Sequence, residues 1–251
     1  MNPAEFANIA KAEQKLWWYR GMNQILYRLI QRYGPPPGPH RVLEGGCGTG
    51  YLATQLEDRF GWNVNALDLG SQGLRYGRDM GLSRLIQGDI TALPFASEAF
   101  DIVVSMDVIV HLPLGVEWRA TTELTRVVRE DGLLFIRVSA LDILHSRHST
   151  FAHERQRFSR ARLIRAFEDV GVDVLRCTYA NSLLMPVALA KFRIWEPLTD
   201  QAPASGVEPV EPWLDSLLYA PLSAEASWIG SGLNFPAGQS LFLVGRRRRK
   251  P

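Results

Sequence analysis

The stretch Val42-Leu43-Glu44-Gly45-Gly46-Cys47-Gly48-Thr49-Gly50 decides the fold, because it joins an apolar strand to a glycine-rich turn and the start of a helix. Gly46, Gly48 and Gly50 reach backbone angles that are closed to other residues, and without side chains they let a ligand approach the main chain. A dinucleotide fingerprint G-x-G-x-x-G needs its third glycine at position 51, where Tyr51 stands. The spacing G-x-G-x-G, with Glu44 upstream, therefore indicates a nucleotide cofactor other than NAD.

The turn resembles that of the class I S-adenosylmethionine-dependent methyltransferases, and an acid further along the chain strengthens the resemblance. Fold order predicts a second strand that ends about 20 residues later in an acid placed to bind ribose hydroxyls. Residues 63–68 supply this strand, and Asp68 is the acid. A hydrogen bond to such a charged group is worth on the order of 1.5 to 3 kcal/mol. We expect Asp68 to bind the cofactor; the alternative is a solvated acid at a strand end.

The resemblance covers nearly the whole chain and implies further site residues. Asp89 and Ile90, in the segment after the third strand, would approach the adenine amino group and pack on its ring. Residues 100–112 match the fourth strand and the turn beyond it, which line the cofactor and face the acceptor. The implied cofactor is S-adenosyl-L-methionine, with S-adenosyl-L-homocysteine as product. The implied cofactor-binding residues are Glu44, Gly46, Cys47, Gly48, Thr49, Gly50, Asp68, Leu69, Asp89, Ile90, Met106 and Asp107.

Composition is typical of an enzyme of ordinary size. The chain has 251 residues, of which 46% are hydrophobic and 22% charged, and a formal net charge of +2. Cys47 and Cys177 form no disulfide framework, and we expect both to be buried thiols in a reducing compartment. Because the N-terminus lacks a long uncharged apolar run, we expect neither a signal peptide nor a membrane span. A cytoplasmic location follows as a prediction.

Strand and helix patterns alternate along the chain, as in an α/β sheet covered by helices on both faces. The helix expected over residues 115–129 is followed by Asp131 and Gly132, which turn the chain into the fifth strand. Ser159 is expected to cap the next helix. The resemblance implies a Rossmann-like, mostly parallel sheet with an antiparallel last strand. Strands are expected at 41–45, 64–68, 84–87, 102–106, 133–138, 172–179 and 240–245.

Two appendages flank this core. A helix face between Met22 and Tyr33 stops at three prolines, and residues 180–239 are too long for a hairpin connection. In this insertion Pro186 is expected in a first helical turn, and Pro221 to bend or interrupt a later helix. Its aliphatic runs fit packing against the body or a second subunit, or a lid for an apolar substrate. We divide the chain into an N-terminal helical cap (1–37), a cofactor-binding core (38–179), a helical insertion or lid (180–239) and a last strand with a basic tail (240–251).

The leader before the first long helix is rich in aromatic residues. Trp17, Trp18 and Tyr19 fit two interpretations: ordinary packing, or a cover over the cofactor site, where an aromatic face near a sulfonium gains about 0.5 to 2 kcal/mol. Arg20 is a candidate for binding the methionyl carboxylate. With this tryptophan-rich leader and the late insertion, the chain resembles one subgroup of the methyltransferases, similar to methyltransferase type 11.

Histidines are the candidate proton acceptors, since the unperturbed pKa of histidine lies near neutrality. His111 follows the fourth strand at the cofactor edge, and its role is catalytic or structural. A second group of histidines and arginines lies after the fifth strand, where it would line an acceptor pocket or form a solvated basic loop. We expect no metal there, because no ligand pair has a clear geometry. The group consists of His145, Arg147, His148, His153, Arg155 and Arg157.

The basic run 246–250 is expected to be a frayed, solvated end, since no basic stripe interleaved with aromatics accompanies it. We therefore expect no nucleic-acid partner. The sequence favours a methyltransferase acting on a small molecule, glycan-linked, lipid-like or a secondary metabolite, with a homodimer through the apolar appendages as one option. Two other classes stay open: a non-catalytic S-adenosylmethionine-binding or scaffold protein, and, disfavoured by the glycine spacing, a nicotinamide oxidoreductase.

Overall fold

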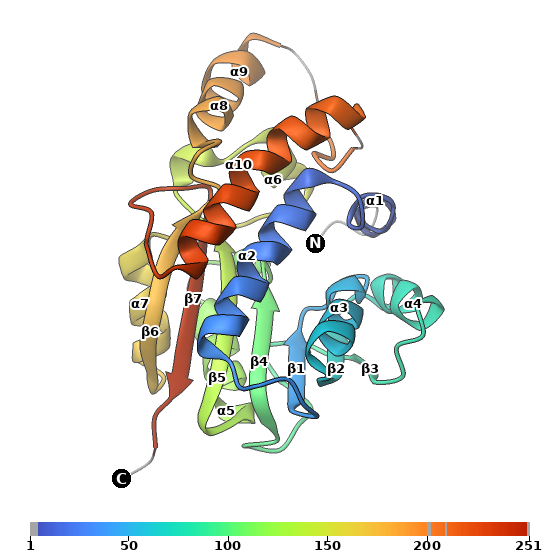
Figure 1. Cartoon of the computed structure of the whole chain (residues 1–251), viewed down its shortest axis with the longest axis vertical. Helices are drawn as coiled ribbons and strands as arrows, with labels where there is room; N and C mark the ends of the chain where they lie inside the picture. The colour runs from blue at the N-terminus through green and yellow to red at the C-terminus, as the bar shows by residue number, and fades with distance from the viewer. Residues whose placement is uncertain (1–4, 200–201, 209, 250–251) are drawn as a thin grey trace.

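The computed structural model describes residues 5–199, 202–208 and 210–249, which fold into a mostly parallel sheet flanked by helices (Figure 1). The strand order is β3-β2-β1-β4-β5-β7-β6, and β7 runs antiparallel to both neighbours. This is the Rossmann-like arrangement that the sequence predicts. The strands in the described ranges are β1 (Arg41–Gly45), β2 (Asn63–Asp68), β3 (Leu85–Gln87), β4 (Phe100–Met106), β5 (Val128–Ser139), β6 (Val172–Ala180) and β7 (Ser240–Arg247).

The helices cover both faces of the sheet. Alternate residues of a strand point to opposite faces, so Val42 packs with α2, α3 and α10, whereas Leu43 packs with α5 and α7. Burial on both faces explains why the strands are nearly continuous apolar runs. The helical segments are α1 (Glu5–Ala12), α2 (Trp17–Tyr33), α3 (Tyr51–Phe60), α4 (Ser71–Asp79), η1 (Ile109–His111), α5 (Glu117–Val127), η2 (Asp142–Leu144), α6 (Arg147–Phe151), α7 (Arg160–Glu168), α8 (Met185–Ala190), η3 (Lys191–Trp195), α9 (Glu196–Leu198) and α10 (Pro212–Gly230).

Each predicted strand is present, and β5 differs most from its prediction. It begins at Val128, directly after α5, whereas the sequence predicts a turn at Asp131 and Gly132 before the strand. Val128 already pairs with Phe100 of β4, and the register then shifts. Asp131 has a φ of +58° within this irregularity. The predicted turn is therefore a distortion inside the strand.

Helix α10 packs along α2, and the two helices lie side by side in Figure 1. Leu222 and Ile229 of α10 are fully buried together with Met22 of α2. The helices approach closely at Gly21, where a Cβ atom would lie 2.5 Å from Cβ of Leu222. Packing of the insertion against the body is thus confirmed for α10. The predicted interruption at Pro221 does not occur, because α10 runs through this residue. We attribute the continuous helix to its buried face, whose packing offsets the hydrogen bond lost at the proline.

The basic run at the end of the chain is part of the fold as far as Arg249. Arg247 is buried in β7 and donates a hydrogen bond to the carbonyl oxygen of Val128. Arg248 pairs with Asp173 at 2.6 Å, and Arg249 pairs with Asp131 at 2.5 Å. The prediction of a frayed end is therefore wrong for Arg246 and Arg247, which belong to β7, whereas Arg246, Arg248 and Arg249 are exposed, as predicted for a solvated end; Lys250 lies outside the described residues.

Both cysteines are free and buried, as predicted. Burial raises the pKa of Cys47 well above its usual range and that of Cys177 to about 11, so both thiols stay protonated at neutral pH. Throughout the described ranges, the helices are too short or too polar to cross a membrane.

Candidate active site

The glycine-rich turn lies at the carboxyl end of β1. Gly46, Gly48 and Gly50 have φ angles of +87°, +58° and +83°, in the left-handed region that favours glycine. A Cβ atom at Gly46 would lie 2.2 Å from Cγ2 of Val108, and one at Gly50 would lie 2.7 Å from Leu82. At Gly48 nothing lies within 4 Å of that position. Packing therefore fixes both ends of the turn and leaves Gly48 open to a ligand.

The carboxylate of Asp68, at the end of β2, holds this turn in place. Its Oδ2 accepts a hydrogen bond from the N–H of Gly48 at 2.8 Å, and its Oδ1 accepts one from the N–H of Gly70 at 2.7 Å. Burial raises the pKa of Asp68, and the two hydrogen bonds oppose that shift. Because each carboxylate oxygen has further lone-pair capacity, Asp68 can still accept hydrogen bonds from a ligand hydroxyl.

The other residues predicted to hold the adenosine lie along the same edge of the sheet. Leu69 is 68% exposed, and Asp89 is exposed after β3. Ile90, in contrast, is buried in the core. Helix α1 also lies along this edge, since the ring of Phe6 would lie 2.7 Å from a Cβ atom at Gly70. Helix α1 therefore lies beside the segment that follows Asp68, a position that the sequence did not predict.

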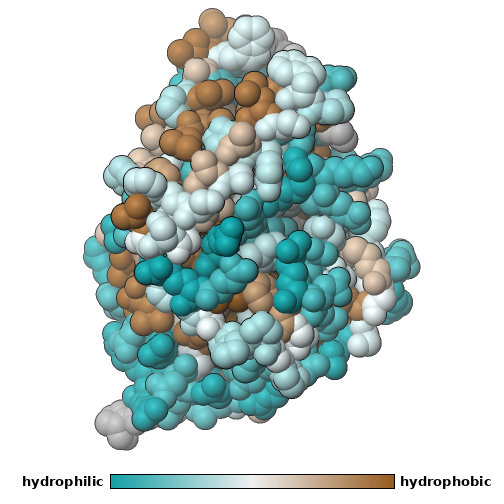
Figure 2. Space-filling model, viewed as in Figure 1, coloured by the Kyte–Doolittle hydropathy of each residue, from teal (hydrophilic) through white to brown (hydrophobic). Residues whose placement is uncertain are grey.

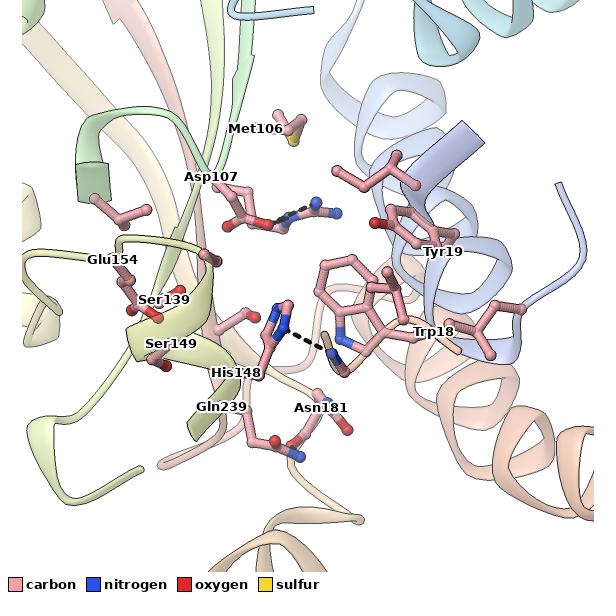
Figure 3. Close-up of a pocket in the computed structure, with 18 of the residues that line it drawn as sticks. Trp18, Tyr19, Met106, Asp107, Ser139, His148, Ser149, Glu154, Asn181 and Gln239 are labelled. Atoms are coloured by element: carbon pink, nitrogen blue, oxygen red, sulfur yellow. Dashed lines mark hydrogen bonds and ion pairs between the residues drawn. The ribbon is translucent and has the colours of Figure 1, made fainter. Parts of the chain in front are cut away.

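A cavity of about 470 Å³ opens beyond the glycine turn, between the carboxyl ends of the central strands and helices α1, α2 and α8 (Figure 3). This volume lies within the range of small-molecule sites. Trp17, Trp18 and Tyr19 line it and also pack against buried apolar residues, so the aromatic leader has both a covering position and a packing role. Its wall also includes the predicted residues Glu44, Gly46, Cys47, Gly48, Thr49, Met106, Asp107 and His111. The wall does not include Arg20, Gly50, Asp68, Leu69, Asp89 and Ile90.

One end of the cavity is acidic. Glu44 is buried at the end of β1, and its Oε2 has no hydrogen-bond partner within the protein. Burial raises the pKa of Glu44 well above its usual range. Glu13, which enters from the segment between α1 and α2, accepts a hydrogen bond from the hydroxyl of Thr49. Burial raises the pKa of Glu13 to about 7. The sequence analysis did not identify Glu13 as a site residue, because nothing local to it indicates that it folds back onto the turn.

A buried arginine and a half-buried aspartate form an ion pair farther along the cavity wall. Nε of Arg137, on β5, lies 2.8 Å from Oδ2 of Asp107, and Nη2 lies 2.7 Å from the same oxygen. The guanidinium also lies over the ring of Trp18, 4.9 Å from its centroid. Nη1 of Arg137 and Oδ1 of Asp107 are buried without hydrogen-bond partners. Arg137 was not predicted as a site residue, although a charged residue within the apolar run of a central strand is a signal that could have identified it.

Arg20 is engaged away from the cavity. Its guanidinium pairs with Asp215 of α10 and lies over the ring of Tyr219, 4.3 Å from the centroid. The other carboxylate oxygen of Asp215 accepts a hydrogen bond from the N–H of Trp17 at 2.6 Å, at the start of α2. The structure thus places Arg20 in the contact between α2 and α10.

His111 lies in the cavity wall after β4. Its Nδ1 is 3.2 Å from the carbonyl oxygen of His153. Because a carbonyl oxygen can only accept, a hydrogen bond there requires the proton on Nδ1 and leaves Nε2 with a lone pair. Burial lowers the pKa of His111, which favours the neutral ring at neutral pH. The arrangement can hold a proton acceptor at the cavity.

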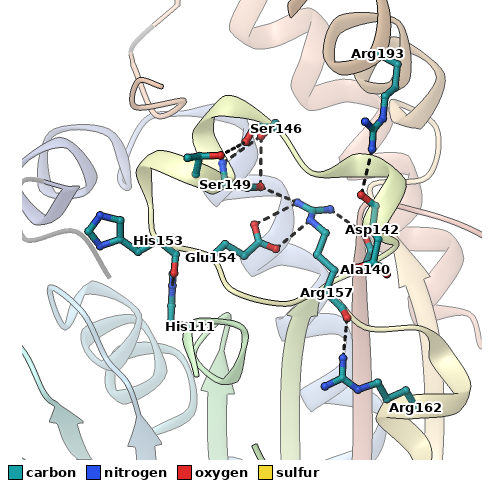
Figure 4. A network of polar contacts seen from close by, with 11 residues as sticks. His111, Ala140, Asp142, Ser146, Ser149, His153, Glu154, Arg157, Arg162 and Arg193 are labelled. Atoms are coloured by element: carbon teal, nitrogen blue, oxygen red, sulfur yellow. Dashed lines mark hydrogen bonds and ion pairs between the residues drawn. The ribbon is translucent and has the colours of Figure 1, made fainter. Parts of the chain in front are cut away.

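The basic loop after β5 divides between the cavity and the solvent. His148 and Arg157 line the cavity, whereas His145, His153 and Arg155 are exposed. Arg157 donates to the carbonyl oxygen of Ala140 at 2.8 Å and pairs with Glu154 at 3.0 Å (Figure 4). Nδ1 of His148 accepts a hydrogen bond from the N–H of Gly206 at 2.9 Å. Within the described ranges, His, Cys, Asp and Glu side chains form no group of three or more that could hold a metal.

Comparison with known proteins agrees with this geometry. Residues 43–136, from β1 into β5, match the family model described as "Methyltransferase domain". This stretch of the chain is thus similar to methyltransferase domains. The chain is 37% identical over 100 residues to malonyl-[acyl-carrier protein] O-methyltransferase of Pectobacterium atrosepticum, covering 38% of this chain and 36% of that protein. The chain thus spans about two-fifths of the length of the first curated relatives that it matches.

Solved structures share the fold of the chain, including its appendages. A putative methyltransferase solved in complex with the Trm112 activator of Haloferax volcanii aligns with a TM-score of 0.63 at 20% identity, over 99% of this chain and 95% of that one. The [4+2]-cyclase SpnF aligns with a TM-score of 0.59 at 18% identity, over 92% and 81%. At these identities the likeness shows the fold alone.

Proposed function

We propose that this chain transfers a methyl group from S-adenosylmethionine to a small-molecule acceptor. The observation that carries the proposal is the glycine turn, tied to Asp68 and open at Gly48, at the entrance to a cavity that the stretch similar to methyltransferase domains helps to line. The protein also offers buried acceptor atoms for a cationic ligand, since Oε2 of Glu44 lacks a partner. Such an atom is costly to leave unpaired, so these residues fit the cofactor.

The cofactor would span the turn and the edge of the sheet. Asp68 would accept hydrogen bonds from the ribose hydroxyls, and Leu69, Asp89 and Ile90 would border the adenine. Glu44, together with Glu13, would lie near the methionyl ammonium, and Met106 and Asp107 near the sulfonium. The remaining predicted members of the turn, Gly46, Cys47, Thr49 and Gly50, would shape the backbone around it.

The predicted role of Arg20 requires that its guanidinium leave Asp215. We propose to test it with Arg20→Ala beside Asp215→Ala, which breaks the same ion pair but keeps the guanidinium. Loss of cofactor affinity in Arg20→Ala alone supports binding of the methionyl carboxylate. Equal affinities in both variants and the parent remove that role from Arg20.

S-adenosylmethionine supplies an electrophilic methyl group for direct displacement by a nucleophile. The protein aligns the reactants, and alignment contributes roughly 7 to 11 kcal/mol at the upper end. Trp17, Trp18 and Tyr19 exclude water from the cavity. Where the acceptor is a hydroxyl or an ammonium group, His111 takes its proton on Nε2, while the carbonyl oxygen of His153 holds the ring.

The identity of the acceptor, the cellular location and the oligomeric state are proposals as well. Several relatives are malonyl-[acyl-carrier protein] O-methyltransferases, which favours an oxygen nucleophile. A protein that binds the cofactor without transferring methyl groups is the second candidate. The same fold in a protein described as a [4+2]-cyclase favours it, since a fold alone does not fix the chemistry. A cytoplasmic location and a homodimer through the apolar appendages stay predictions.

Calorimetry with S-adenosylmethionine and S-adenosylhomocysteine tests the proposal. We expect Asp68→Ala and Gly48→Val to lose binding, because they remove the ribose acceptor and close the open face of the turn. Gly81→Val is the matched control, since Gly81 has a φ of +91° and free space around it but lies outside the cavity wall. No binding by the parent protein refutes the proposal, and binding without methyl transfer in a broad metabolite screen favours the second candidate.

A further inference from the structure

We propose that Arg137 binds a carboxylate of the methyl acceptor, and that this acceptor carries an apolar chain. The inference rests on the proposed function, which it deepens by assigning a substrate class. Arg137 is 6% exposed and lies in the cavity wall, with its Nη1 buried and unpartnered. Unlike the unpartnered oxygens of Glu44 and Asp107 in the same wall, this atom is a hydrogen-bond donor.

The position of Arg137 favours the acceptor over the cofactor. It lies on β5 and pairs in register with Met106 of β4, whereas the cofactor turn follows β1 and Asp68 is the last residue of β2. In the sheet order, β5 is one strand beyond β4, on the side away from β1 and β2. The acidic residues Glu44 and Glu13 lie near the turn instead. A cationic cofactor end and an anionic acceptor end therefore occupy separate parts of one cavity.

The charge around Arg137 favours a carboxylate over a phosphate. Asp107 already takes Nε and Nη2, so it neutralises most of the guanidinium charge and leaves one nitrogen free. Any anion at the free nitrogen is repelled by the carboxylate of Asp107, and this repulsion is smaller for a carboxylate with one negative charge than for a phosphate dianion with two. The hydroxyl of Tyr19 lies in the same wall and can donate a second hydrogen bond.

One side of the cavity is apolar, beside polar side chains such as Asn181 and Lys191 that also line the wall. Leu184, Val187, Ala188 and Phe192, from α8 and the segments beside it, line the wall. The same segments expose large apolar side chains on the outside, and Figure 2 shows apolar surface at this end of the molecule. These exposed residues are Leu183, Ile194, Trp195 and Leu198. An acceptor with an apolar chain buries it against this wall while Arg137 holds its charged end.

Binding of octanoate and octanamide to the protein saturated with S-adenosylhomocysteine tests the inference by calorimetry. The two probes have the same chain and differ in charge. We expect octanoate to bind at least tenfold more tightly than octanamide, and octyl phosphate to bind more weakly than octanoate. Arg137→Gln should reduce the preference for octanoate to less than twofold while the affinity for S-adenosylhomocysteine is unchanged. Arg129→Gln, which changes an exposed arginine, should keep the preference.

Further variants keep the test decisive. Arg137→Gln alone leaves Asp107 unpaired, so the double variant Arg137→Gln/Asp107→Asn restores neutrality, and its circular dichroism reports folding. Equal binding of octanoate and octanamide by the parent overturns the inference. It is also overturned if the preference for octanoate is lost in Lys191→Gln and retained in Arg137→Gln. Weaker S-adenosylhomocysteine binding in Arg137→Gln assigns the arginine to the cofactor instead. Failure of the parent to bind S-adenosylhomocysteine refutes the proposed function. Octanoate is then titrated into the free protein, so that the role of Arg137 is tested separately.

Discussion

Glu13 is the buried carboxyl group at which we expect the stability of the protein to depend on pH. Burial raises its pKa from 4.5 to about 7, so the folded protein binds a proton there that the unfolded chain releases between these values. Stability therefore falls as the pH rises from 4.5 to 7, and the full cost is present above pH 7. A shift of about 2.5 pKa units at 1.36 kcal/mol per unit costs about 3 kcal/mol.

The variant Glu13→Gln removes the charge and keeps an oxygen that can accept the hydrogen bond from Thr49. We expect it to be about 3 kcal/mol more stable than the parent at pH 8 and equal to it at pH 5, by urea unfolding at both pH values. Glu208→Gln changes an exposed carboxyl group and is the control. The reasoning is refuted if the free energies of unfolding of Glu13→Gln and the parent differ by the same amount at both pH values. It is also refuted if the variant is less stable than the parent at pH 8.

Three further predictions concern packing, catalysis and cofactor binding. Leu222→Ala should lower the free energy of unfolding by about 2 to 5 kcal/mol, measured in urea, whereas the exposed Leu217→Ala should change it by less than about 0.5 kcal/mol. His111→Ala should lower kcat by about 10²-fold or more while cofactor affinity stays within twofold, provided that the acceptor must lose a proton; unchanged kcat assigns His111 a structural role. Binding of S-adenosylmethionine should weaken about fivefold from pH 7 to pH 6 in the parent, as Glu13 is protonated, and not in Glu13→Gln.

The core of the fold was predictable because its signals are local. The glycine turn, the acid at position 68 and the apolar strands each occupy a few consecutive residues, and a parallel sheet fixes where they meet. Ser159 likewise caps α7 by accepting a hydrogen bond from the N–H of Arg162. The β5 irregularity was not predictable in this way, since it depends on pairing with β4.

The cavity wall was only partly predictable, because it combines segments that are distant in sequence. Glu13 reaches the site by folding back onto Thr49, and Arg137 meets Asp107 across two strands. Arg247 also donates a hydrogen bond to a carbonyl oxygen of β5, a strand far along the chain, so a run of like charges gave a wrong prediction of a frayed end there. Such pairings follow from tertiary structure and leave no mark in local periodicity.

The contact between α2 and α10 ties the two appendages over the cavity into one mechanical unit. Asp215 accepts a hydrogen bond from Trp17 across 198 residues of sequence, and Leu222 fills the space that Gly21 leaves. A relative that exchanged only its leader, or only its insertion, would lose this fit and expose apolar surface. Grafting of acceptor specificity between such proteins therefore has to transfer both segments together.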